Sequence, residues 1–135
     1  MQLRRSGPGI AVSSMAAVLF AQCDGSDSLR LGHGDTLVFA DRGAHQCQQD
    51  GMTPEVSAQR LIDAGVDVLK SYCGQRTGVA FPAVCGAPTG DILLHQIRAA
   101  NLPDAERLGF QNVAQLAAIG QGYVLVDCTT RRPLP

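Results

Sequence analysis

The stretch Ser71–Asp91, with the sequence SYCGQRTGVAFPAVCGAPTGD, decides the fold that we expect. Cys73 and Cys85 lie on either side of the segment Gln75–Gly78, and a glycine directly follows each of them. The segment Gln75–Gly78 has the composition of a turn, and strand-like runs precede and follow it. We therefore predict a hairpin whose two cysteines face each other and form a disulfide.

The second arm of this predicted hairpin is Val79–Cys85, where apolar positions alternate. Pro82 has no backbone N–H to donate, which places this arm at a sheet edge or a bulge. Arg76 and Thr77 would then occupy the tip of the hairpin. Because loops on rigid scaffolds often carry function, we predict that Arg76 and Thr77 form an interaction loop.

Upstream of the hairpin, Thr36–Ala40 is rich in β-favouring residues and predicts a strand. Thr53, Pro54 and Glu55 form a helix start with a cap, a first-turn proline and an acid at the positive end of the dipole. The helical spacing predicts a buried stripe at Ala58, Leu61, Ile62 and Gly65, followed by a strand over Val66–Tyr72.

Downstream, Asp91–Ile97 predicts a strand that is buried on both faces, because Ile92, Leu93 and Leu94 are consecutive. Asn101 is the predicted cap of a second helix, which directs Leu102, Ala105 and Leu108 inward and ends at Gly109. A last strand is expected over Tyr123–Cys128. These elements predict an α+β fold, a ferredoxin-like split βαβ sandwich with an antiparallel sheet and two main helices on one face.

Composition limits the function classes. The chain has 135 residues, 45% of them hydrophobic and 17% charged, which suits a single domain with an aliphatic core. The net charge is −1, and no basic stripe with interleaved aromatic residues occurs, so we expect no nucleic-acid partner.

The N-terminus is typical of an export signal. Arg4 and Arg5 precede an apolar run at Ile10–Ala21 that is too short to span a bilayer, and polar residues follow it. The alternative is a buried N-terminal helix. We predict a signal peptide over residues 1–21, a flexible lead-in over 22–34, one domain over 35–128 and a disordered tail over 129–135. No membrane span is expected after cleavage.

The five cysteines support export, because widely spaced cysteines in an oxidising compartment form disulfides. Cys23 lies near the predicted cleavage site. The other four, Cys47, Cys73, Cys85 and Cys128, allow three connectivities. We favour Cys73–Cys85 with Cys47–Cys128, while 47–73 with 85–128, and 47–85 with 73–128, stay open.

Two chemical alternatives involve these cysteines. His45 and Cys47 have the spacing of a soft-metal pair for copper or zinc, but the sequence supplies no second cluster of ligands. A redox-active dithiol is the other alternative, although catalytic pairs usually have only two residues between them. No cofactor is predicted.

Other catalytic patterns are absent from the sequence. The acids fall mostly at caps and turns, no G-x-S-x-G motif occurs, and His95 follows an apolar run as a partly exposed or hydrogen-bonded histidine. The loops Gly74–Gly78 and Gly86–Gly90 are not followed by the Lys-Ser/Thr pair of a phosphate-binding loop.

The region around residues 51–110 resembles small exported bacterial proteins of unknown function. The resemblance rests on Ala64-Gly65, on Tyr-Cys-Gly and Ala-Val-Cys-Gly around the two cysteines, and on the segment Ala105–Phe110. Such a family brings no assigned activity. We therefore predict a periplasmic or secreted, disulfide-stabilised binding module without catalytic activity, whose partner is an unknown protein or envelope component.

Overall fold

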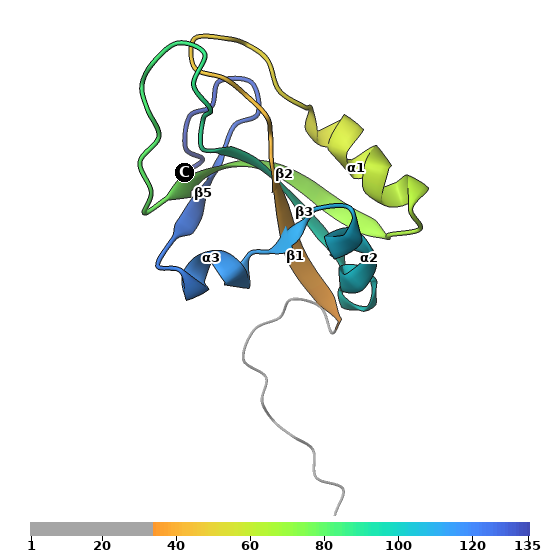
Figure 1. Ribbon diagram of the computed structural model, residues 1–135. Coiled ribbons are helices and arrows are strands. Elements are labelled where there is room, and N and C mark those ends of the chain that lie inside the picture. The colour runs from red at the N-terminus through yellow and green to blue at the C-terminus, as the bar shows by residue number, and fades with distance from the viewer. Residues whose placement is uncertain (1–33) are drawn as a thin grey trace, which may run out of the picture.

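The computed structural model describes residues 34–135. The predicted signal peptide, nearly all of the lead-in and Cys23 lie outside the described residues. The described chain is an α+β fold (Figure 1). Its elements in chain order are β1 (Asp35–Asp41), α1 (Pro54–Asp63), β2 (Val68–Thr77), β3 (Asp91–Arg98), the short 3-10 helix η1 (Ala99–Asn101), α2 (Leu102–Arg107), β4 (Gln111–Asn112), α3 (Ala114–Ala118) and β5 (Gly122–Val126).

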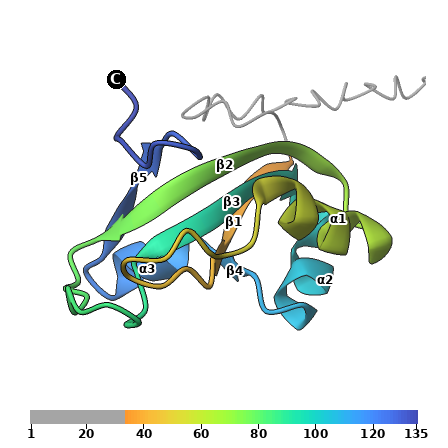
Figure 2. The same ribbon diagram turned by 90° about the horizontal axis from the view of Figure 1, so that it is seen from above.

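The five strands form one antiparallel sheet in the order β4-β1-β3-β2-β5. The sheet curls (Figure 2), and the register between β2 and β3 shifts between Val68 and Lys70. Such an irregularity bends a strand and increases its twist. The predicted α+β class with an antiparallel sheet is confirmed, but the ferredoxin-like sandwich is not, because the curled sheet has the shape of a half-barrel.

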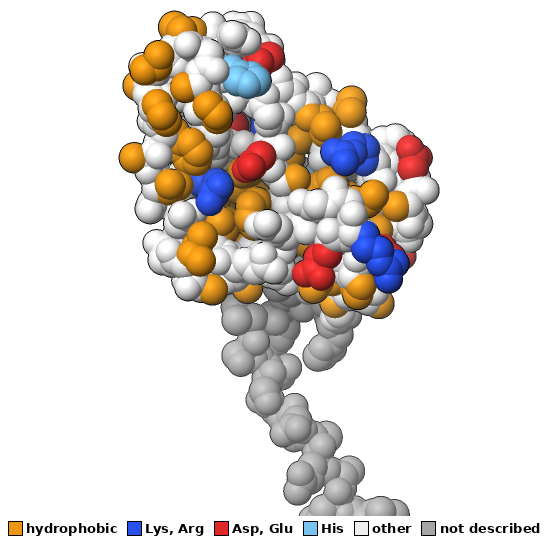
Figure 3. Space-filling model, viewed as in Figure 1, with side chains coloured by type: hydrophobic (Ala, Val, Ile, Leu, Met, Phe, Trp, Pro, Cys, Tyr) orange, Lys and Arg blue, Asp and Glu red, His pale blue; other side chains and the backbone are white. Residues whose placement is uncertain are grey.

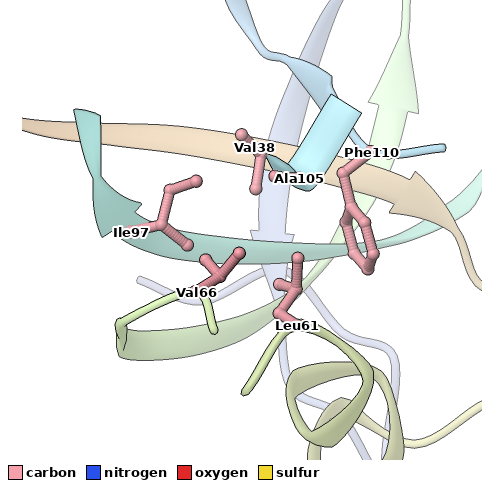
Figure 4. Packing of buried hydrophobic residues seen from close by; sticks show 6 residues of the cluster. All are labelled: Val38, Leu61, Val66, Ile97, Ala105 and Phe110. Carbon is pink, nitrogen blue, oxygen red and sulfur yellow. The ribbon is translucent and has the colours of Figure 1, made fainter. Parts of the chain in front are cut away.

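Helices α1 and α2 pack on one face of the sheet. Their shared core consists of Val38, Leu61, Val66, Ile97, Ala105 and Phe110 (Figure 4). The opposite face carries a second cluster, in which Leu116 of α3 packs with Phe39, Ile92 and Leu94. Strand β3 is therefore covered on both faces, as predicted from its continuous apolar run.

Helix α1 begins where the sequence predicts. Thr53 Oγ1 accepts a hydrogen bond from the Val56 N–H, and Pro54 is the first helical residue. The predicted buried stripe was partly wrong. Ile62 is 49% exposed, whereas Ser57 is buried beside Leu61. The spacing of apolar residues could not predict the burial of Ser57, because this side chain is polar and is buried through a hydrogen bond to a core histidine.

The hairpin at Ser71–Asp91 differs most from its prediction. Strand β2 continues through the expected turn to Thr77 and pairs there with β5. The segment 78–90 contains no strand and connects β2 to β3 as a long loop. The expected second arm at Val79–Cys85 is wrong, because β5 supplies the backbone partner that this arm would have provided.

The second helix and the C-terminal tail also depart from the prediction. Asn101 makes no side-chain cap for α2; its Oδ1 instead accepts a hydrogen bond from the Asp67 N–H. The tail, predicted to be disordered, folds back along β5. The Leu134 N–H donates to the Leu125 carbonyl, and Val126 and Pro133 form an isolated bridge.

Candidate functional site: an arginine pocket

The four described cysteines form two disulfides, Cys47–Cys85 and Cys73–Cys128. The favoured pairing of Cys73 with Cys85 was wrong, and the pairing is one of the alternatives left open. Cys73 lies opposite Val126 in the sheet, so that the end of β5 brings Cys128 to it. Cys85 lies in the long loop, where backbone hydrogen bonds join Gln46 to Gly86 and Ala87.

This pairing bears on the soft-metal alternative. The sulfur of Cys47 is bonded to Cys85 and is no thiolate ligand in this state. His45 Nδ1 lies 2.6 Å from Asp50 Oδ2. The hydrogen bond from the His45 backbone N–H holds the pKa of Asp50 below its usual range, and the bond from the His45 ring adds a smaller effect. Within residues 34–135, no group of three or more His, Cys, Asp or Glu side chains is placed to hold a metal ion.

Arg76 and Thr77 lie in β2 rather than at an exposed tip. They pair with Tyr123 and Gly122 of β5, respectively. The side chain of Arg76 is only 21% exposed, and its Nη2 donates to Gln121 Oε1 at 2.5 Å. The turn expected around them was therefore wrong, but Arg76 does line a pocket.

This pocket lies where β2 ends and β3 begins, and we call it the arginine pocket. Its volume is about 320 Å³. Segments from four parts of the chain form its walls: the loop after β1, the end of β2 with the long loop, the start of β3, and the tail. The lining residues are Gln46, Gln75, Arg76, Val79, Phe81, Thr89, Gly90, Asp91 and Arg131.

The two disulfides hold the walls of the pocket together. Cys47–Cys85 joins the segment of Gln46 to the long loop, and Cys73–Cys128 fixes the start of the tail that carries Arg131. Each bridge closes a long chain segment, which typically contributes roughly 2–4 kcal/mol to stability.

One of the residues that line the pocket is a buried acid. The side chain of Asp91 is 7% exposed, and its Oδ2 lies 3.3 Å from Arg131 Nη1. The two groups of this ion pair are not aligned for a hydrogen bond, so Asp91 Oδ2 has no hydrogen-bond partner. Arg76 Nε is the other buried side-chain atom in residues 34–135 without such a partner. Both atoms belong to residues of the arginine pocket.

The backbone beside the pocket is also unusual. Two non-glycine residues in residues 34–135 have positive φ, Cys47 at 65° and Arg131 at 56°. Cys47 adjoins the lining residue Gln46, and Arg131 lines the pocket itself. Asp127 Oδ1 supports the turn before Arg131 by accepting from the Thr129 and Thr130 N–H groups. These hydrogen bonds hold the pKa of Asp127 below its usual range, and the bond from the Thr130 N–H has the largest effect.

A second polar cluster lies in the core, away from the pocket. His95 is fully buried between Ser57 and Ser71, whose Oγ atoms lie 2.9 Å from Nε2 and 2.7 Å from Nδ1. Phe110 packs edge-on against the imidazole. Burial lowers the pKa of His95 to about 4, so the ring is neutral at pH 7. With both nitrogens satisfied, His95 fits the hydrogen-bonded role predicted for it.

The sequence pointed only weakly to the pocket. The general assignment of the acids to caps and turns gave Asp91 no other role, and Arg131 falls in the tail predicted to be disordered. The one available signal was an acid directly before a continuous apolar run, which places a carboxylate at the entrance to a buried strand.

Comparisons with protein-family models, with curated proteins and with solved structures found no match to this chain. The helices of residues 34–135 are too short or too polar to cross a membrane. On the face shown in Figure 3, charged side chains are few and dispersed.

Proposed function

We propose that this chain is an exported, disulfide-stabilised binding module without catalytic activity, and that the arginine pocket is its ligand site. Two disulfides are typical of proteins that mature in an oxidising compartment, which supports a periplasmic or secreted location. The expected interaction loop contributes Arg76 to this site, whereas Thr77 faces β5 instead.

One observation carries the proposal. Among residues 34–135, the two buried side-chain atoms without hydrogen-bond partners, Arg76 Nε and Asp91 Oδ2, both belong to residues of one pocket. Leaving a buried polar group unsatisfied costs about 1–3 kcal/mol. Strained backbone and incompletely paired polar groups concentrate at functional sites, and here Arg131 combines a positive φ with the ion pair to Asp91.

A small-molecule panel tests this function. The oxidised protein would be titrated with sodium benzoate, benzamide, benzylamine, inorganic phosphate and glucose while backbone amide shifts are recorded by NMR. We expect at least one compound to shift the amides of Gln75–Phe81, Thr89–Asp91 and Arg131. The proposal fails if no compound shifts these amides, or if the shifts lie elsewhere.

Two variants of the long loop make the test specific. Val79 lines the pocket, so Val79→Trp should fill it and abolish the shifts. Val84 lies in the same loop, is 65% exposed and is not a lining residue, so Val84→Trp is the matched control and should bind as the wild type does.

A further inference from the structure

We infer that the ligand of the arginine pocket is a small organic monocarboxylate whose apolar body lies against Phe81. This inference rests on the proposed function and specifies its ligand class. It is argued from the charges of the pocket, the geometry of its guanidinium groups and the nature of its apolar wall.

The charges that line the pocket favour an anion with one negative charge. Arg76 and Arg131 are cationic, and Asp91 is the one acid among the lining residues. Asp41 also lies 3.9 Å from Arg76 Nη1, but its side chain is 74% exposed and borders a different pocket. Solvent screens such an exposed pair, so one positive charge is left for a ligand.

The arginines offer the donors that a carboxylate needs. A guanidinium group has five N–H donors in a planar fork and binds carboxylates through two parallel hydrogen bonds. The Arg131 side chain is 33% exposed and contacts Asp91 through Nη1. The rest of its fork is therefore available to a ligand. A dianion such as hydrogen phosphate would bring two negative charges to a pocket that has one positive charge left. Repulsion between its extra charge and Asp91 disfavours its binding.

Part of the pocket wall is apolar. Phe81 and Val79 line the pocket, and the guanidinium carbon of Arg76 lies 5.9 Å from the centre of the Phe81 ring. Gly90 makes room for that ring, since a Cβ atom at this position would come within 2.6 Å of Phe81 Cε2. A flat or compact apolar group beside a carboxylate would contact this wall.

The size of the pocket limits the ligand. A volume of about 320 Å³ is near the lower end for ligand pockets, which span roughly 300–1,000 Å³. A single small acid therefore fits better than an extended chain.

The probe is sodium benzoate, titrated into the oxidised full chain at constant ionic strength, with benzamide as its uncharged analogue. We expect benzamide to bind at least about tenfold more weakly, because it lacks the charge-assisted hydrogen bonds. Arg131→Gln should weaken benzoate binding by a similar factor. The adjacent Arg132→Gln removes the same charge from an exposed residue outside the pocket and should change binding by less than about twofold.

A second variant leaves the ion pair of Asp91 untouched. Phe81→Leu should weaken benzoate about threefold or more but leave acetate unchanged, because acetate has no body to contact the ring. If benzamide or phosphate binds the pocket as tightly as benzoate, the carboxylate inference is overturned while the pocket stands as a binding site. If no compound of the panel shifts the pocket amides, both proposals fall.

Discussion

His95 is a buried imidazole whose two ring nitrogens lie beside serine hydroxyls. Ser57 of α1 and Ser71 of β2 lie on opposite ring nitrogens, so the histidine joins a helix to two strands. A neutral ring has one N–H and one acceptor nitrogen, and the two hydroxyls satisfy both. Because burial disfavours the charged ring, His95 links stability to pH.

The sign of this linkage follows from its lowered pKa. The pKa is about 4 in the folded protein against 6.5 ordinarily, so the unfolded chain binds more protons between these values. The contribution of His95 to the free energy of unfolding is complete above pH 6.5. It is lost as the pH falls toward 4, and the loss amounts to roughly 3 kcal/mol. Urea unfolding at pH 7, 5.5 and 4 measures it.

The variant His95→Gln should flatten this dependence between pH 6.5 and 4. His45→Gln, at the half-exposed histidine paired with Asp50, is the control and should keep the contribution of His95. A wild-type slope in His95→Gln would contradict the assignment.

The ion pair of Asp91 and Arg131 gives a second prediction. Asp91 is buried and Arg131 is partly exposed, so Arg131→Gln leaves the buried charge of Asp91 without its partner and should lower the free energy of unfolding by about 1–3 kcal/mol. The double variant Asp91→Asn/Arg131→Gln should be more stable than the single variant, because no charge is left behind. Denaturant unfolding of the wild type, of Asp91→Asn and Arg131→Gln singly and of the double variant gives the coupling energy, and strictly additive effects would show that the two side chains are independent.

At the scale of elements, α3 is a short helix that packs against the sheet through one buried side chain. Leu116 is its single buried residue and packs into the cluster of Phe39, Ile92 and Leu94. This contact covers the face of the sheet opposite α1 and α2. Five residues are too few for a helix to be stable by itself, so tertiary packing must stabilise α3.

Shortening this side chain should therefore be costly. We expect Leu116→Ala to lower the free energy of unfolding by about 2–5 kcal/mol, through lost burial and the cavity left behind. Ile119 follows the same helix but is 64% exposed, and Ile119→Ala should change stability by no more than about 0.5 kcal/mol. Equal losses in thermal or urea unfolding would show that α3 does not pack as described.

At the scale of the whole molecule, two disulfides connect segments that are distant in sequence. The bridges have sequence separations of 38 and 55 residues. Cys47 and Cys85 are both exposed, whereas the second bridge joins the exposed Cys128 to Cys73, which is 2% exposed and packs with Leu93 and Val126. Access to an attacking thiolate therefore differs between the two bridges.

We expect dithiothreitol to reduce Cys47–Cys85 before Cys73–Cys128 in the native protein. Timed alkylation followed by peptide mass spectrometry would identify the cysteines released at each stage. In guanidinium chloride the buried sulfur becomes accessible, and the preference should disappear. If Cys73 and Cys128 are alkylated first in native protein, burial does not control the order.

The sequence by itself determined the features that depend on neighbouring residues. The cap and proline at Thr53–Pro54 start α1, the apolar run in Asp91–Ile97 forms a strand covered on both faces, and Gly109 ends α2 with a φ of 91°. The number of cysteines available for bridges was also evident. Each of these features follows from local backbone preferences and hydrophobic periodicity.

Only the tertiary structure decided the disulfide pairing and the arginine pocket. Cys73 bonds to Cys128 because β5, rather than the segment after Gly78, pairs with the end of β2. Arg131 reaches Asp91 because the tail folds back along β5. Contacts of this kind join residues far apart in the chain, and no local pattern specifies them. Their geometry exists only after the sheet has curled and β5 has paired with β2 as its edge strand.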